Sequence, residues 1–274
     1  MNIDELRSKQ QNGVHDLLST LRTVEINPVD VCNRACSFCP RSDATLYPNT
    51  KEKISLELIL KIAKDLKSIN YTGRVSFVGF GEPLLYKSLV RAVKIIADEV
   101  DCEWIEINTN ADFLTRSVAT DLSLAGCTNI TVSMYDSDIS QLLKEQLKDI
   151  DLELTFKHCY EEKFEVSLIN RNDIISQKLI LNIEKECYLP FYKMFIDWNG
   201  DVLVCCNDWG RQGVVGNLYN STIEEIWLSE EMTNYRSFLT NGDRKGVNPC
   251  KYCNIDGTRY GEESFNFFNK HILS

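Results

Sequence analysis

The sequence lacks the features that would place it at a membrane or on nucleic acid. No run of about 18 apolar residues occurs in its 274 residues, so we expect no membrane-spanning helix. Lys and Arg number 30 against 40 Asp and Glu, and the resulting net charge of −10 argues against a nucleic-acid partner. The first residues, MNIDELRSKQQNGVHDLL, include acidic residues and no apolar core segment, so we expect no signal peptide.

Repeats, low-complexity runs and Pro/Gly-rich linkers are also missing, and the 3 histidines form no constellation. Hydrophobic residues make up 43% of the chain, which is enough for a sizeable core. The length then fits one large domain, or one domain with a small appendage.

Cysteine, by contrast, is abundant, with 11 residues. Without export, so many cysteines are not expected to pair as disulfides, and their odd number also argues against a fully paired framework. Metal or redox chemistry in a reducing, cytoplasmic setting is the better interpretation.

Seven of these cysteines form two spaced groups. The first is Cys32, Cys36 and Cys39 in VCNRACSFCP (31–40), and the second is Cys187, Cys205, Cys250 and Cys253. A cluster iron with three protein ligands keeps a site open for a substrate or cofactor, whereas a cluster with four is closed. Zinc is the alternative metal for both groups, although a structural zinc ion needs four protein ligands.

Strand and helix patterns alternate over the first two-thirds of the chain. The predicted strands are 23–29, 74–80, 103–108, 129–135, 152–156 and 164–170. The predicted helices are 56–69, capped by Ser55, then 88–100, one ending near Gly126, and 140–150. Strands that alternate with helices imply parallel βαβ units in an open sheet or a barrel.

The pattern changes after about residue 180. Residues 191–206 read as a hairpin, for which Asn199-Gly200 predicts a type I′ turn. Ser221 and Glu224 fit a capping box that opens one helix over 221–231. With few apolar residues per element, this segment is predicted to be a small appendage stabilised by metal.

The cysteine triplet and its flanks resemble the cluster-binding loop of the radical S-adenosylmethionine (SAM) superfamily. GFGEP (79–83), INTNA (107–111) and VSMYD (132–136) are similar to that family's motifs after the second, third and fourth strands. The resemblance covers most of the first 180 residues. It implies an α/β fold in which residues 1–180 form a partial (β/α)6 TIM-like barrel with an N-terminal helix outside it.

The resemblance also implies a mechanism. A 4Fe–4S cluster on the triplet leaves one iron to chelate SAM, and reductive cleavage gives a 5′-deoxyadenosyl radical that abstracts hydrogen from an unactivated carbon. The implied SAM contacts are Phe38, Gly79, Gly81, Glu82, Asn108, Asn110, Ser133 and, more weakly, Asp136. Taken alone, the glycines fit a tight turn, the asparagines fit turn positions, and Phe38 fits packing.

Residues 181–274 resemble the C-terminal SPASM/twitch extensions of radical SAM enzymes, which carry auxiliary iron–sulfur clusters. No cysteine follows Cys253, so the shorter twitch form, with one auxiliary 4Fe–4S cluster on the second cysteine group, fits better than full SPASM. Iron–sulfur is therefore favoured over zinc. Cys206 is a spare thiol beside Cys205, either a hydrogen-atom donor or a buried thiol.

The positions of the auxiliary cysteines and the compact length look similar to twitch dehydrogenases of aminocyclitol pathways. That resemblance implies oxidation of a secondary alcohol of a sugar or aminocyclitol to a ketone, with flavodoxin or ferredoxin as electron donor. It places Arg171 at the substrate, where a surface salt bridge is the alternative.

Two other reactions stay open. A redox-neutral carbohydrate epimerase would use Cys206 as the hydrogen donor. A peptide- or protein-modifying maturase is the other, although about 22 residues before the first strand are too few for a peptide-binding winged helix.

Overall fold

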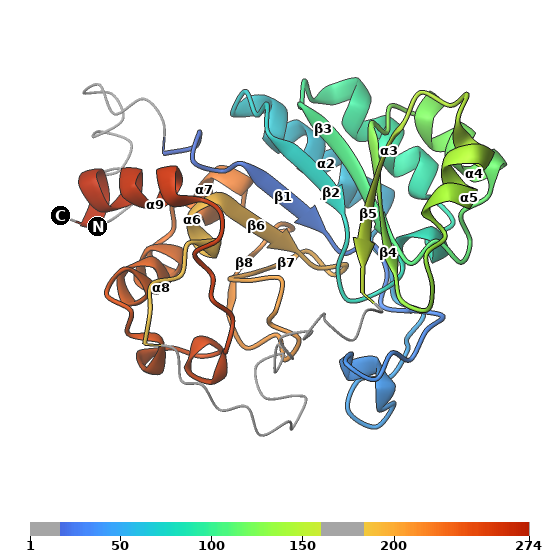
Figure 1. Ribbon diagram of the computed structural model, residues 1–274. Helices are drawn as coiled ribbons and strands as arrows, with labels where there is room; N and C mark the ends of the chain where they lie inside the picture. The colour runs from blue at the N-terminus through green and yellow to red at the C-terminus, as the bar shows by residue number, and fades with distance from the viewer. Residues whose placement is uncertain (1–16, 160–183, 274) are drawn as a thin grey trace.

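The computed structural model describes residues 17–159 and 184–273. They form one eight-stranded sheet with helices packed against it (Figure 1). The strands are β1 (Thr23–Ile26), β2 (Arg74–Phe77), β3 (Trp104–Thr109), β4 (Asn129–Met134), β5 (Glu153–His158), β6 (Lys193–Ile196), β7 (Asp201–Leu203) and β8 (Val214–Asn217). The helices of at least four residues are α2 (Leu56–Ser68), α3 (Leu89–Glu99), α4 (Arg116–Leu124), α5 (Ser140–Leu147), α6 (Leu189–Tyr192), α7 (Ile223–Trp227), α8 (Glu230–Thr240) and α9 (Glu262–Phe268).

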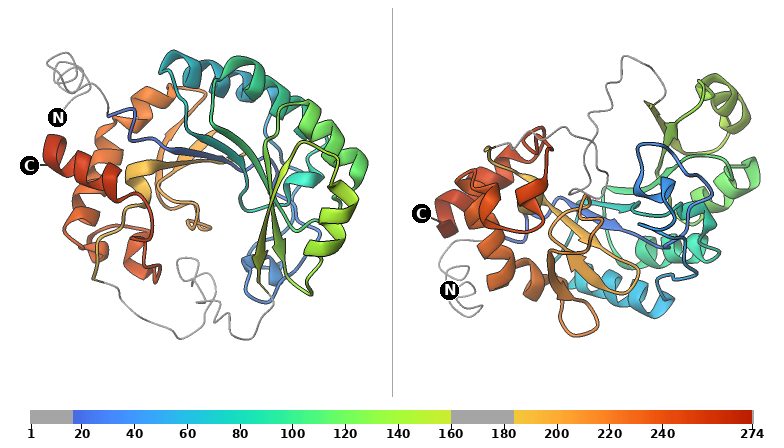
Figure 2. Two further views of the ribbon diagram at one scale, coloured as in Figure 1. Left: turned by 45° about the horizontal axis from the view of Figure 1, so that its top comes forward. Right: turned by 90° about the horizontal axis from the view of Figure 1, so that it is seen from below.

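The sheet is parallel through most of its width. Its strand order is β5-β4-β3-β2-β1-β6-β7-β8, and all pairs from β5 to β6 are parallel, whereas β7 and β8 are antiparallel additions. Figure 2 shows the sheet strongly curved, with α2 to α5 along its convex side. The described strands do not close into a full barrel. The predicted α/β fold, an open barrel of βα units followed by a small C-terminal unit, is confirmed.

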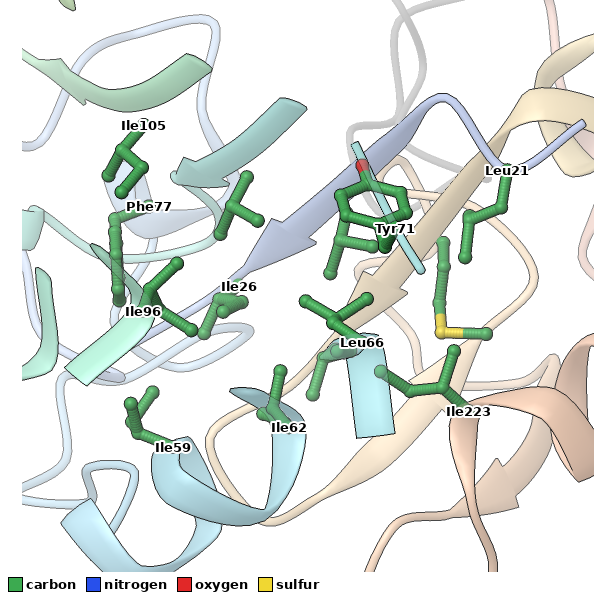
Figure 3. Close-up of a cluster of buried hydrophobic side chains, with 14 of the residues drawn as sticks. Leu21, Ile26, Ile59, Ile62, Leu66, Tyr71, Phe77, Ile96, Ile105 and Ile223 are labelled. Atoms are coloured by element: carbon green, nitrogen blue, oxygen red, sulfur yellow. The ribbon is translucent and has the colours of Figure 1, made fainter. Parts of the chain in front are cut away.

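The apolar core lies between the convex face of the sheet and helices α2 and α3. Alternate strand residues such as Ile26, Phe77 and Ile105 point toward the helices, where they meet Ile62 and Ile96 (Figure 3). All five are at most 4% exposed. This alternation turns the intervening residues toward the concave face.

That concave face is polar rather than apolar. The Oγ of Ser76 on β2 and the Oγ1 of Thr131 on β4 donate to the two carboxylate oxygens of Glu106 on β3, at 2.8 and 2.5 Å. Glu25 on β1 and Lys193 on β6 form an ion pair on the same face, with 2.5 Å between Nζ and Oε1. Strands predicted only as alternating segments therefore build a hydrophilic barrel interior.

The C-terminal unit is tied to the barrel at several points. Strand β6 pairs with β1 along its whole length, and the Nζ of Lys61 on α2 donates to the carbonyl of Ser221 at 2.8 Å. The Trp227 indole Nε1 donates to the carbonyl of Leu17 at 3.1 Å. Because β6 is a strand of the main sheet, this unit is more than the appendage that the sequence suggested.

Three local predictions were wrong. In the β6–β7 hairpin only Gly200 has a positive φ (+84°), and Asn199 does not, so the turn is not type I′; the backbone N–H of Gly200 donates to the Asp197 carbonyl in a longer loop. The capping box is formed by Thr222 and Glu225 instead of Ser221 and Glu224. The helix expected over 221–231 divides into α7 and α8, with Ser229 capping the second.

Some predicted features cannot be compared with the structure. The N-terminal helix and the strand over 164–170 lie outside the described residues, and so does Arg171. Within residues 17–159 and 184–273, none of the helices has the length and apolar character needed to cross a membrane.

Candidate functional site

The first cysteine group lies in the loop that follows β1, at the carboxyl end of the parallel strands. Asn49 holds Cys32 from both sides: its Oδ1 accepts from the Cys32 N–H at 2.9 Å, and its Nδ2 donates to the Cys32 carbonyl at 3.0 Å. Arg41 donates from Nη1 to the same Oδ1 at 2.8 Å and from Nε to the Phe80 carbonyl at 2.5 Å. The loop is thus fixed to the loop after β2.

Arg34, inside the cysteine triplet, joins this loop to two further strand ends. Its Nε and Nη2 donate to the two carboxylate oxygens of Asp112, and its Nη1 donates to Asp136 at 2.7 Å. The Asp112 contact is bidentate, which fixes the orientation of the guanidinium plane. Hydrogen bonding from Arg34 lowers the pKa of Asp112, so this carboxyl stays ionised in the folded protein.

The glycines of GFGEP are required for close packing of two loops. A Cβ on Gly79 would lie 2.5 Å from Oδ1 of Asn27, and one on Gly81 would lie 2.2 Å from the carbonyl oxygen of Val29. The same Asn27 oxygen accepts from the N–H groups of Phe80 and Gly81, at 3.0 and 3.3 Å. The loop after β2 therefore rests directly on the end of β1.

Glu82 is 3% exposed and fastens the loop after β3. Its Oε1 accepts from the Thr109 hydroxyl at 2.6 Å, and its Oε2 accepts from the Asn110 N–H at 2.9 Å. Burial raises the pKa of Glu82, and the hydrogen bonds from Asn110 and Thr109 oppose that rise. The role of Glu82 as a SAM contact stays a prediction, and its hydrogen bonds also hold the loop after β3 in position.

These loops enclose one cavity of about 190 Å³, partly open to solvent, which we call the large cavity. Its lining includes every residue predicted for the first cluster and every main predicted SAM contact: Cys32, Cys36, Phe38, Cys39, Gly79, Gly81, Glu82, Asn108, Asn110 and Ser133. Four separate motifs thus converge on one space. Asp136, the weaker candidate, is not part of the lining and pairs with Arg34 instead.

The second cysteine group converges as well. All four residues, Cys187, Cys205, Cys250 and Cys253, line one cavity together with apolar residues such as Leu189 and Ile255, and we call it the four-cysteine cavity. Burial raises the pKa of Cys187 to about 11, and burial also raises that of Cys36 in the large cavity to about 11. Metal binding at either place must therefore release protons from the thiols.

Arg244 and Gly257 shape the four-cysteine cavity. The Arg244 guanidinium lines the cavity and donates to the carbonyls of Lys185, Glu186 and Asp256 at 2.7–2.8 Å. A Cβ on Gly257, whose φ is +75°, would lie 2.5 Å from the Cys187 sulfur. A fixed cation beside four thiols suits a thiolate-bound metal group.

The thiols of the two cysteine groups do not form a ready-made site for a single metal ion. Among the described residues, no three His, Cys, Asp or Glu side chains come close enough together to hold one metal ion. A mononuclear zinc site gathers four sulfurs at about 2.3 Å from one centre, whereas a cluster spreads its cysteines around a larger body. All eleven cysteines are free of disulfides. Both sets of thiols therefore fit iron–sulfur groups.

Cys206 is not in the lining of the four-cysteine cavity, but it hydrogen-bonds with Cys205 and lies within electrostatic range of Cys187 and Cys253. Its thiol packs against an aromatic cluster formed by Tyr47, Phe80, Phe195 and Trp209 with Leu203, and it lies within electrostatic range of Glu25 and Lys193. The prediction that it is a spare thiol is consistent with this placement. Whether it donates a hydrogen atom stays a prediction.

Sequence reasoning missed several residues of the site. Tyr135 and Trp209 line the large cavity, and the Tyr135 ring lies 5.4 Å from that of Phe38 between centroids. Tyr135 stands inside the VSMYD motif, so the motif itself was a signal. Trp209 comes from the C-terminal unit, and no local pattern marks it or Arg244 as part of a site.

Comparison with known families agrees with this geometry. Residues 26–157 match the family described as "Radical SAM superfamily", and residues 187–254 match "SPASM", an iron–sulfur cluster-binding domain. Apart from Trp209, the first match contains the lining of the large cavity, and apart from Ile255, the second contains the lining of the four-cysteine cavity.

Individual proteins are similar over most of the chain. The S-adenosyl-L-methionine-dependent 2-deoxy-scyllo-inosamine dehydrogenase of Niallia circulans is 29% identical over 244 residues, which are 87% of this chain and 94% of that protein. A GTP 3′,8-cyclase of Clostridium perfringens is 25% identical, over 85% of this chain and 69% of its own length. The crystal structure of BtrN in complex with AdoMet and 2-DOIA superposes with a TM-score of 0.73 at 25% identity, covering 88% of this chain and 97% of BtrN.

Fold, converging cysteines and family matches thus agree on the cofactors, which are SAM and two iron–sulfur clusters. The chain thus contains a radical SAM domain, matched over residues 26–157, and a C-terminal SPASM-type cluster-binding domain, matched over residues 187–254.

Proposed function

We propose that this protein is a radical SAM dehydrogenase that oxidises a secondary alcohol of a small polyhydroxylated substrate, a sugar or an aminocyclitol, to a ketone. The name of the Niallia circulans relative, a 2-deoxy-scyllo-inosamine dehydrogenase matched over nearly its whole length, supports this reaction class. The same similarity supports a substrate that is a small molecule.

The observation that carries the proposal is the convergence of four motifs on the large cavity. The three thiols of the loop after β1 face the Gly-Glu loop after β2 and the asparagines and serine of β3 and β4. A triplet of ligands beside a polar cavity suits a cluster that shares an open iron with SAM.

We assign roles residue by residue within that cavity. Cys32, Cys36 and Cys39 hold the first cluster, and Arg34 and Asn49 hold the loop in place around it. Glu82, Asn108 and Asn110 bind the polar groups of SAM, with Ser133 donating to Oδ1 of Asn108 at 3.2 Å. Phe38 and Tyr135 offer a ring surface for the adenine.

The second cluster is assigned to Cys187, Cys205, Cys250 and Cys253, with Arg244 as the fixed cation beside it. Four protein ligands leave no open iron, which suits electron transfer rather than substrate binding. When bound, SAM and the first cluster supply hydrogen-atom abstraction from carbon, and the second cluster supplies a one-electron acceptor. The protein must also take up the hydroxyl proton and keep water away.

The test is turnover by the anaerobically reconstituted protein with SAM, dithionite and a panel of sugars and cyclitols. We expect one 5′-deoxyadenosine for each product, and a product that has lost two hydrogens. Deoxyadenosine formed without any change in the added sugars or cyclitols would contradict the proposal.

Epimerisation is the second candidate, because Cys206 lies near Glu25 and Lys193 without lining the four-cysteine cavity. An epimerase returns a hydrogen atom to carbon, and a thiol is a suitable donor. Turnover in deuterated water separates the two reactions, since only epimerisation gives a product of unchanged formula with one solvent deuterium.

We further propose a cytoplasmic setting, with a flavodoxin or ferredoxin as reductant.

A further inference from the structure

A second polar region lies on the concave face of the sheet, next to the large cavity. Val78, directly after β2, and Asn108 on β3 line that cavity, and Ser76 on β2 and Glu106 on β3 precede them by two residues. Glu25 on β1 pairs in register with Ser76, which in turn pairs with Glu106. A ligand that fills the barrel interior beside the large cavity therefore meets this row of side chains.

Only one of the two carboxylate oxygens of Glu25 has a hydrogen-bond donor among the described residues. Its Oε1 accepts from the Nζ of Lys193 at 2.5 Å, but its Oε2 is buried and has no hydrogen-bond partner among the described residues. Glu25 as a whole is 8% exposed. A buried carboxylate oxygen without a donor costs free energy, so this oxygen calls for a donor from outside the described residues.

Arg74, diagonally across from Glu25 on the neighbouring strand β2, has a donor atom without an acceptor in the part of the chain that the structure describes. Its Nη1 lies 3.7 Å from a carboxylate oxygen of Glu106, and its Nε is buried without an acceptor among the described residues. Glu106 itself is satisfied by Ser76 and Thr131. One acceptor and one donor thus lie unpaired on adjacent strands.

The charges of this region are already balanced. Lys193 pairs with Glu25 and Arg74 with Glu106, giving two cations and two carboxylates. Burial works against the charged form of Lys193, but the Glu25 carboxylate outweighs it and raises the pKa of Lys193, so the ammonium is charged at neutral pH. A ligand ammonium at this place would be a third cation in a poorly solvated site.

We propose that Glu25 and Arg74 bind two neighbouring hydroxyl groups of the substrate, and that Lys193 selects a neutral polyol over an amine at this position. A hydroxyl both donates and accepts, so a pair of them satisfies Glu25 Oε2 and Arg74 Nε, whereas an ammonium only donates. The inference rests on the proposed function, whose substrate class it narrows to neutral sugars or cyclitols.

The place of this subsite agrees with the proposed reaction. It adjoins the large cavity on one side, and Cys206, next in sequence to the second cluster's proposed ligand Cys205, lies within electrostatic range of Glu25 and Lys193.

The experiment compares Lys193→Met with wild type in the reconstituted holoprotein. The probes are scyllo-inositol, which is neutral, and 2-deoxy-scyllo-inosamine, which carries an amino group, and the dissociation constants are measured anaerobically by calorimetry. Wild type should bind the neutral probe at least tenfold more tightly. Lys193→Met frees Glu25 for a cation, so this preference should fall at least tenfold or reverse.

Controls separate this effect from general damage. Lys64→Met removes a lysine from the exposed face of α2 and should leave both dissociation constants unchanged. Arg74→Met should weaken both probes about tenfold without altering the preference. If Lys193→Met unfolds because Glu25 is left bare, the double variant Glu25→Gln/Lys193→Met removes both charges and should bind the two probes equally.

Three outcomes would each overturn the inference. The wild type could prefer the amine, or bind neither probe detectably. The preference could also be unchanged in Lys193→Met and in the double variant. Deoxyadenosine formation is measured separately in the same samples. If a probe is oxidised but the binding preference is the same in wild type and Lys193→Met, the proposed function stands and the proposed subsite is refuted. If the binding preference changes as expected but no sugar or cyclitol is oxidised, the subsite stands and the proposed function is refuted.

Discussion

At the scale of single residues, Arg34 has a larger structural role than its place between two cysteines suggests. It joins the loop after β1 to carboxylates that follow β3 and β4, and its guanidinium lies 5.6 Å from the centre of the Tyr135 ring. One side chain thereby fixes the position of the cysteine triplet relative to the ends of β3 and β4.

We expect Asp112→Asn to loosen the first cluster site. The change removes the charge from a bidentate contact, so the rate at which a chelator extracts iron from that site should rise about tenfold, or ~1.4 kcal/mol. Asp136→Asn is the matched control, because its single contact comes from a carboxylate that is 74% exposed. Equal rates in the two variants would contradict the assignment.

The same contact gives a pH dependence. Because Arg34 lowers the pKa of Asp112, the contact stabilises the folded protein fully above the ordinary Asp pKa, and the stabilisation is lost as pH falls through the lowered value. Chelator-accessible iron in wild type should therefore increase on acidification, and Asp112→Asn should show a smaller increase.

Cys36→Ala should abolish SAM cleavage and leave the second cluster in place. The variant removes one of three proposed ligands of the open cluster but none that line the four-cysteine cavity. Deoxyadenosine formation is the assay, and the absorbance of the remaining cluster is the internal control. Deoxyadenosine at the wild-type rate would refute the ligand assignment.

Single residues also show where sequence reasoning ends. The triplet spacing and the Gly-Glu motif identified the lining of the large cavity because each is a local pattern. Lys193 and Glu25, by contrast, are 168 positions apart, and each looks like an ordinary strand residue. Their pairing depends on β6 lying beside β1, which no local pattern specifies.

At the scale of elements, the segment STIEEIWLSEE shows how packing selects among equivalent local signals. Ser221 with Glu224 and Thr222 with Glu225 both fit the capping-box spacing, so the sequence alone cannot distinguish them. Starting at Ile223 buries Ile223, Ile226 and Trp227 on one face of α7. The apolar face thus decides which of the two boxes forms.

This reading predicts unequal effects for two neighbouring alanine substitutions. Thr222→Ala removes the cap of α7 and should cost about 1 kcal/mol, which corresponds to a fall of roughly 2–4 °C in the thermal midpoint. Ser221→Ala should change the midpoint by less than about 1 °C, since the hydrogen bonds of Ser221 to Asn217 and Lys61 use its backbone N–H and carbonyl, which alanine keeps. A larger effect at Ser221 would mean that the other box forms in solution.

At the scale of the whole molecule, the aromatic cluster of Tyr47, Phe80, Phe195 and Trp209 brings the barrel and the C-terminal unit together beside the large cavity. Cys39 packs against this cluster as well as Cys206. Trp209 and Phe80 lie 4.6 Å apart between ring centroids, and both line the large cavity. A residue of the C-terminal unit therefore completes the wall of the site formed by the barrel.

The two-cluster assignment predicts a simple stoichiometry. Cys253→Ala should lose roughly half of the bound iron, because one of two similar clusters is removed. Iron analysis of the anaerobically reconstituted protein measures this, with Cys102→Ala as the control, since Cys102 lines neither cavity. Iron content equal to wild type would remove Cys253 from the ligand set.

The pairing of β6 with β1 limits where this chain can be joined to a related chain in a chimeric protein. A chain cut ahead of Lys193 would leave one long edge of β1 without its hydrogen-bonding neighbour, and bare edges invite intermolecular pairing. The cluster-binding C-terminal unit is thus not an interchangeable cassette. Chimeras with relatives should succeed only when the crossover lies beyond β6, so that barrel and sixth strand are inherited together.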